Sequence, residues 1–249
     1  MGICFVTEVC MKRIAQKALL PLNLIMITAV LVLNYFYQRI GFPLTLKCVC
    51  SGGFALLGIF NLGYALITRK RNTRFHFGMA GGLLLAFLGD VLIDRSFIIG
   101  AVAFALGHVC FVLAYGFLQR FRLTDLIPSA TVFFGALLFL LLCPLLTFSV
   151  PIFKAVCIVY AAIISCMLGK AIGNLIREPG ALTATLALAS ALFFFSDLML
   201  VFDWFIGRWS WTSHACMGTY YPALCLMAFS MCVHDIGTSA SARHHGGIR

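Results

Sequence analysis

The feature that most constrains this chain is a succession of apolar runs, each about 20 residues long, the length that an α-helix needs to cross a bilayer. Short gaps that carry proline, glycine or basic residues separate these runs. Hydrophobic residues make up 62% of the 249 residues and charged residues 10%. A soluble domain is about 45–50% apolar and about 25% charged. The sequence therefore predicts an all-α polytopic membrane protein with little room for a separate soluble domain.

The separators divide the chain into eight predicted transmembrane helices. Because the gaps are short, we expect consecutive helices to pack antiparallel. Residues 1–17 are expected to precede the bundle, and residues 234–249 to form a short, polar, disordered tail. The eight helices are predicted at Ala18–Tyr37, Thr45–Ile67, Phe77–Ile93, Ser96–Leu118, Leu126–Thr147, Pro151–Ile176, Ala181–Phe205 and Thr212–Val233.

Basic residues are distributed unevenly between the two ends of the predicted bundle. With eight spans, 13 of the 18 lysines and arginines fall on the side that holds both termini, and 5 fall on the other side. The positive-inside rule then predicts that both termini are cytosolic. The net charge of +10 is explained by this topology and by anionic lipid, so it does not indicate nucleic acid.

Two aspartates lie where the sequence is most apolar, Asp90 in the third predicted helix and Asp197 in the seventh. A carboxylate inside a membrane costs about 2.5–3.5 kcal/mol, so such residues usually mark a pathway or a reaction. The alternative is a structural clamp in which each aspartate hydrogen-bonds to a neighbouring helix. Both helices run in the same direction, and their rise per residue places both aspartates in the non-cytosolic half of the bilayer. Asp94 and Asp203 are interpreted as residues of the helix ends.

Further polar residues reach the same half of the bilayer and would share a cavity with the aspartates if their faces point inward. Lys47 is either a lysine that extends to the membrane surface or a phosphate contact. His108 is either a hydrogen-bonded structural residue or part of the site. The adjacent Tyr220 and Tyr221 lie about 100° apart around their helix, so at most one of them can face the cavity.

The 11 cysteines are interpreted as small apolar packing residues, because no pair has a convincing metal spacing. The sequence contains no G-x-S-x-G, no H-E-x-x-H and no P-loop. No motif therefore requires a metal or another cofactor.

Taken in chain order, several of these residues make the sequence resemble the YhhN-like lysoplasmalogenase family of eight-span membrane proteins. The resemblance covers roughly residues 15–233, and one position departs from it, because Leu224 stands where the family commonly has glutamine. The residues that carry it are Lys47, Gly89-Asp90, Phe97-Ile98-Ile99-Gly100, Phe104, His108, Ser196-Asp197-Leu198 and Thr219-Tyr220-Tyr221.

The resemblance implies an ether hydrolase that cleaves the vinyl ether bond of lysoplasmalogens. The products would be a fatty aldehyde and glycerophosphocholine or glycerophosphoethanolamine. A lysophospholipid substrate and the bilayer would be its partners, and the endoplasmic reticulum membrane is implied for a eukaryotic member.

The implied chemistry needs a protonated acid and a nearby carboxylate, as in glycoside hydrolysis. Asp90 and Asp197 would be this catalytic pair. Asp197 would be the acid, because Phe193–Phe195 give it the more apolar local sequence and desolvation raises the pKa of a buried aspartate. The substrate-binding residues would be Lys47, His108, Tyr220 and Tyr221. The sequence leaves open the head group, the oligomeric state and two other functions. These are a proton-coupled transporter or channel and a catalytically inactive lipid-binding protein.

Overall fold

The computed structural model describes residues 2–68, 73–148, 150–207 and 209–246, and side chains within these ranges between residues 17 and 238, residue 210 excepted. All regular elements in the described part of the chain are helical, which confirms the predicted all-α class. They are α1 (Gly2–Arg39), α2 (Leu44–Ile67), α3 (Thr73–Ile93), α4 (Phe97–Leu118), the short 3₁₀ helix η1 (Leu123–Asp125), α5 (Leu126–Leu142), α6 (Pro151–Arg177), α7 (Ala181–Phe205) and α8 (Ser210–Gly246).

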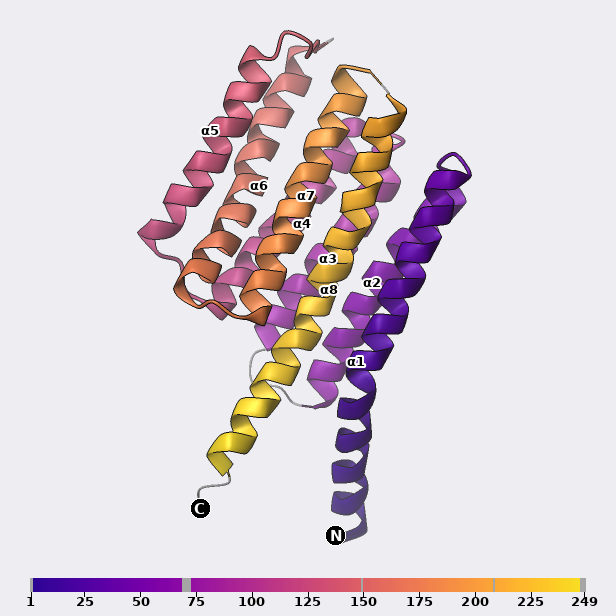
Figure 1. Cartoon of the computed structure of the whole chain (residues 1–249), viewed down its shortest axis with the longest axis vertical. Helices are drawn as coiled ribbons and strands as arrows, with labels where there is room; N and C mark the ends of the chain where they lie inside the picture. The colour runs from indigo at the N-terminus through magenta and orange to yellow at the C-terminus, as the bar shows by residue number, and fades with distance from the viewer. Residues whose placement is uncertain (1, 69–72, 149, 208, 247–249) are drawn as a thin grey trace.

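Six of the helices form a closed ring in which α3 packs on α4, α4 on α6, α6 on α7, α7 on α8, α8 on α2 and α2 on α3. Helix α1 lies outside the ring against α2 and α8, and α5 lies outside it against α6 (Figure 1). Both ends of the chain lie at the same end of the bundle (Figure 1). We call this end of the bundle the terminal end and the other the opposite end.

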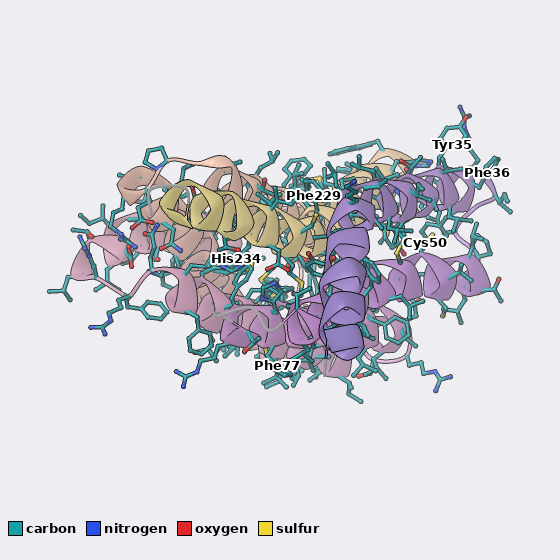
Figure 2. All side chains as sticks on the ribbon, turned by 90° about the horizontal axis from the view of Figure 1, so that it is seen from below. Tyr35, Phe36, Cys50, Phe77, Phe229 and His234 are labelled. Carbon is teal, nitrogen blue, oxygen red and sulfur yellow. The ribbon has the colours of Figure 1, made fainter. Side chains whose placement is uncertain are left out.

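Within the described residues, eight helices are long and apolar enough to cross a membrane. Their outward faces carry large apolar side chains, among them Tyr35, Phe36 and Phe77, while Cys50 and His234 lie inside the bundle (Figure 2). Apolar side chains on the outside and a mixed interior are typical of helices surrounded by lipid. The bundle is therefore that of a multi-pass membrane protein.

The three largest differences between the observed and the predicted helix ends are in α1, α5 and α8, while α7 has the predicted bounds. Helix α5 ends at Leu142 and not at Thr147, because Cys143 precedes Pro144 and has the extended backbone that a residue before proline prefers. Helix α1 begins well before Ala18, at Gly2. Helix α8 continues past Val233 to Gly246, so the predicted end of this helix is wrong.

The residues that directly follow Val233 explain why α8 continues past the predicted end. His234 and Asp235 are buried, and Asp235 forms an ion pair with His76 at the start of α3. The polar residues after Val233 therefore begin inside the bundle, where a helix satisfies their backbone groups.

Candidate functional site

A cavity of about 410 Å³ opens at the opposite end of the bundle, between the α1–α2 turn, α3, α7 and α8. Both aspartates that the sequence marked as anomalous, Asp90 and Asp197, line this cavity. Its remaining walls are a mixture of aromatic and polar side chains. They include Tyr37, Phe42, Lys47, Asp94, Phe104, Ser196, Asp203, Trp204, Ser213 and Tyr220.

Asp90 lies near the C-terminal end of α3 and is 2% exposed. Its Oδ2 accepts a hydrogen bond from Ser51 of α2 and another from the hydroxyl of Tyr221 at 3.3 Å. Its Oδ1 lies 3.3 Å from the ammonium of Lys47. The carboxylate is therefore held by three side chains, and a cation compensates its charge.

Lys47 is itself buried, and its ammonium lies between two acids. It donates a hydrogen bond of 2.9 Å to Asp94, whose side chain is about half exposed, and forms the ion pair with Asp90. An ammonium has three N–H donors. Two of them serve the acids, so one remains for a group inside the cavity that Lys47 lines.

Asp197 in the middle of α7 has a different environment. Its Oδ2 accepts a 2.6 Å hydrogen bond from the hydroxyl of Tyr160 on α6 and lies 3.4 Å from Nε2 of His108 on α4. The same histidine nitrogen is 2.8 Å from the Tyr160 oxygen. The polar contacts that Asp197 makes with other described residues all involve its Oδ2 atom. Its Oδ1 atom can therefore bind a molecule in the cavity.

The two tyrosines of α8 divide their roles as their spacing predicts. Tyr220 lines the cavity and donates to the backbone carbonyl of Ala86 at 3.3 Å. Tyr221 does not line it and instead contacts Asp90 and Ser51. Only one of the pair faces the cavity, as expected, and the other supports a carboxylate.

A second, apolar cavity of about 70 Å³ adjoins the first, between α4, α5, α6 and α7. Asp197, Phe104 and Ile93 line both cavities. The carboxyl group of Asp197 therefore lies where a polar space meets an apolar one. An amphiphilic molecule bound across both cavities would have the junction between its polar head and its apolar tail at this position.

The structure adds residues that the sequence did not single out and changes the interpretation of one other, Asp203. Tyr160 and Ser51 contact the two aspartates, but a lone tyrosine or serine in an apolar helix carries no distinctive signal. Asp203 lines the cavity and accepts hydrogen bonds from the side-chain hydroxyls of Thr212 and Ser213, so it joins the end of α7 to the start of α8 and is more than a solvated helix end.

Leu224, the position that departs from the family pattern, is fully buried in the hydrophobic core and lines neither cavity. Leucine in place of glutamine at this position therefore removes no polar group from the walls of either cavity.

Comparison with known protein families matches residues 51–231 to the YhhN family. Neither the curated proteins nor the solved structures contain a match. The matched segment includes Asp90, Asp197, His108 and Tyr160 and leaves out Lys47. Because the match extends over well more than half of the sequence, the chain belongs to the YhhN family.

Proposed function

We propose that this protein is a membrane hydrolase that cleaves the vinyl ether bond of lysoplasmalogens. The observation that carries this proposal is that Asp90 and Asp197, from two different helices, line one polar cavity, and that Asp197 also lines the adjoining apolar one. Hydrolysis of a vinyl ether needs an acid that protonates the alkenyl carbon and a base that activates water, and a lysoplasmalogen carries a polar head and an apolar tail.

The two carboxyl groups differ in the way that such a reaction needs. The ammonium of Lys47 stabilises Asp90 as a carboxylate, whereas the recorded partners of Asp197 are a tyrosine hydroxyl and an imidazole. Groups whose environments differ in this manner can serve as separate acid and base. We assign the acid to Asp197 and the base to Asp90.

The steps balance with these two residues alone. Asp197 gives its proton to the outer alkenyl carbon, and an oxocarbenium ion forms next to the ether oxygen. Water adds to this cation while Asp90 takes a proton from it, which yields a hemiacetal. The hemiacetal then collapses as Asp197 removes its hydroxyl proton and Asp90 protonates the departing glycerol oxygen. Both residues return to their starting states, and the fatty aldehyde is released together with glycerophosphocholine or glycerophosphoethanolamine.

The cavity walls also favour a particular head group. Four acids line the polar cavity, Asp90, Asp94, Asp197 and Asp203, against one lysine. Aromatic side chains face the same space, namely Tyr37, Phe42, Trp204 and Tyr220. Acids and aromatic faces both attract an ammonium group, while the third N–H of Lys47 suits a phosphate. This combination supports a zwitterionic choline or ethanolamine head group, with the first carbons of the chain in the apolar cavity.

The proposal is tested with purified protein, lysoplasmenylcholine and its saturated alkyl ether analogue. We expect aldehyde from the vinyl ether only, and a loss of at least about 100-fold in Asp90→Asn and Asp197→Asn, as general acid–base groups contribute 10²–10⁴. Glu178→Gln is the matched control, because Glu178 is exposed at the terminal end. Thermal unfolding checks that each variant is folded.

Other outcomes would support the other functions. Binding of lysoplasmenylcholine by the wild-type protein without aldehyde release would indicate a lipid-binding protein that lacks catalysis. Proton flux across vesicles that depends on Asp90 and Asp197, again without aldehyde, would indicate a transporter or channel.

A further inference from the structure

A second group of ionisable side chains lies far from the cavity, at the terminal end of the bundle. His76 stands near the start of α3, and His234 and Asp235 stand on α8. Their exposures are 0%, 9% and 1%. The proposed hydrolysis uses none of them.

The three side chains converge on one point. Nε2 of His76 lies 3.2 Å from Oδ1 of Asp235, and Nδ1 of His234 lies 3.4 Å from the same oxygen. One ligand atom from each residue lies within 4.8 Å of the other two. Zinc binds histidine nitrogen and carboxylate oxygen at about 2.0–2.2 Å, so two such ligands in a tetrahedral site are about 3.3–3.5 Å apart. The two separations measured from Oδ1 of Asp235, 3.2 and 3.4 Å, are close to this spacing.

Both contacts of the Asp235 Oδ1 atom with the histidine nitrogens are longer than the 2.7–2.9 Å of a close charge-assisted hydrogen bond. Histidine is the side chain that can ligate a metal as well as carry a charge.

We propose that His76, His234 and Asp235 form a binding site for a first-row divalent cation, with Zn²⁺ as the best match, that joins α3 to α8. Two imidazoles and one carboxylate are a ligand set that suits zinc and leaves a fourth position for water. The slight exposure of His234 provides access for the ion. The sequence carries no metal motif here because His76 is remote from the other two ligands along the chain and only the packing of α3 on α8 brings them together.

The test uses the full chain, purified in detergent with an affinity tag that contains no histidine, stripped with a chelator and reloaded with Zn²⁺. We expect about one zinc per chain by elemental analysis, as in a single protein site. Zinc should also raise the melting temperature by several degrees, because a ligand that binds only the folded state stabilises it. Co²⁺ in place of zinc should show the visible absorption of a four-coordinate ion.

Variants locate the ion. His76→Gln, His234→Gln and Asp235→Asn should each lose at least about nine-tenths of the zinc and the thermal shift, since removal of a ligand opens the site. His214→Gln, an exposed histidine near the start of α8, is one control. The double change His244→Gln/His245→Gln is the other and removes the two histidines of the tail. Both controls should retain the ion.

Three results would overturn the proposal. A wild-type protein that takes up no stoichiometric zinc would show that the three residues are only a hydrogen-bonded clamp, and this result does not depend on whether any variant folds. Zinc that persists in all three ligand variants, or that disappears in the tail control, would place the ion elsewhere.

Discussion

Tyr160 shows how a single residue can set the geometry of the site without lining the polar cavity. Its hydroxyl donates to Asp197 and lies 2.8 Å from the His108 nitrogen, so it connects three helices at one point. Since these contacts go to Oδ2, they hold the carboxyl group with its other oxygen toward the cavity. We therefore interpret Tyr160 as a positioning residue for the proposed acid.

Removal of the Tyr160 hydroxyl should weaken the proposed acid. In Tyr160→Phe the ring stays, but Asp197 loses its 2.6 Å hydrogen bond. Asp197 becomes negatively charged as it gives up its proton, and a hydrogen bond to a charged group is worth about 1.5–3 kcal/mol, so we expect kcat to fall roughly 10- to 100-fold. KM should change much less, because the walls of the polar cavity are unaltered and the phenylalanine ring keeps the apolar cavity lined. Steady-state kinetics with lysoplasmenylcholine provide the measurement.

Tyr35→Phe is the control for this experiment, because Tyr35 is exposed on the lipid-facing surface of α1. It should leave both kinetic constants unchanged. A Tyr160→Phe protein with wild-type kcat would show that Asp197 needs no such support.

At the scale of helices, the close approach of α3 and α4 places Asp90. Gly82 lies against the ring of Phe111, and Gly89, the residue before Asp90, lies against the ring of Phe104. A Cβ atom at either position would meet a ring atom within 3 Å. Small residues of this kind allow membrane helices to pack closely.

Gly100 of α4 packs directly against the backbone of α3 at Ile93. A Cβ atom there would lie 2.5 Å from the Cα atom of Ile93 and 2.8 Å from its backbone nitrogen, and backbone cannot yield as a side chain can. We expect Gly100→Ala to cost about 1–3 kcal/mol, as overpacking does. The melting temperature in detergent should fall accordingly, and activity should fall with it because Ile93 lines both cavities.

Gly63 of α2 is the matched control, because nothing lies within 4 Å of a Cβ atom placed on it. Gly63→Ala should leave the melting temperature unchanged or raise it slightly. Equal melting temperatures for the two variants would contradict the close contact between α4 and the end of α3.

The orientation of the whole molecule decides from which side the polar cavity is reached. The cavity lies at the end opposite the chain termini. The uneven distribution of basic residues predicts cytosolic termini. The head group would then enter from the non-cytosolic face, or laterally from that leaflet, and the product would leave on the same side.

Tags on the two termini test this orientation. In sealed microsomes that keep their cytosolic face outward, protease should remove an N-terminal and a C-terminal epitope without detergent. Epitopes that are protected until the membrane is opened would place the cavity on the cytosolic side and reverse the predicted route of the substrate.

Much of the site could be predicted because its main residues are locally anomalous. Asp90 and Asp197 stand out as acids among apolar neighbours, and the direction of their helices places them at the same depth. Tyr160 and Ser51 were missed because nothing in their local sequence distinguishes them. Asp235 was assigned to a polar tail because its neighbours are polar, although it is buried against α3.

The all-helical class, the eight spans and the full extent of α7 follow from the sequence, because a chain in lipid must satisfy its backbone groups within each segment, and hydrophobicity is a local property. Which polar side chains meet becomes visible only in the folded bundle. The contacts of Asp197 with Tyr160 and His108, of Asp90 with Ser51 and Lys47, and of Asp235 with His76 join helices that are not all consecutive in the chain. Such contacts depend on how the faces of the helices pack, and the local sequence does not contain that information.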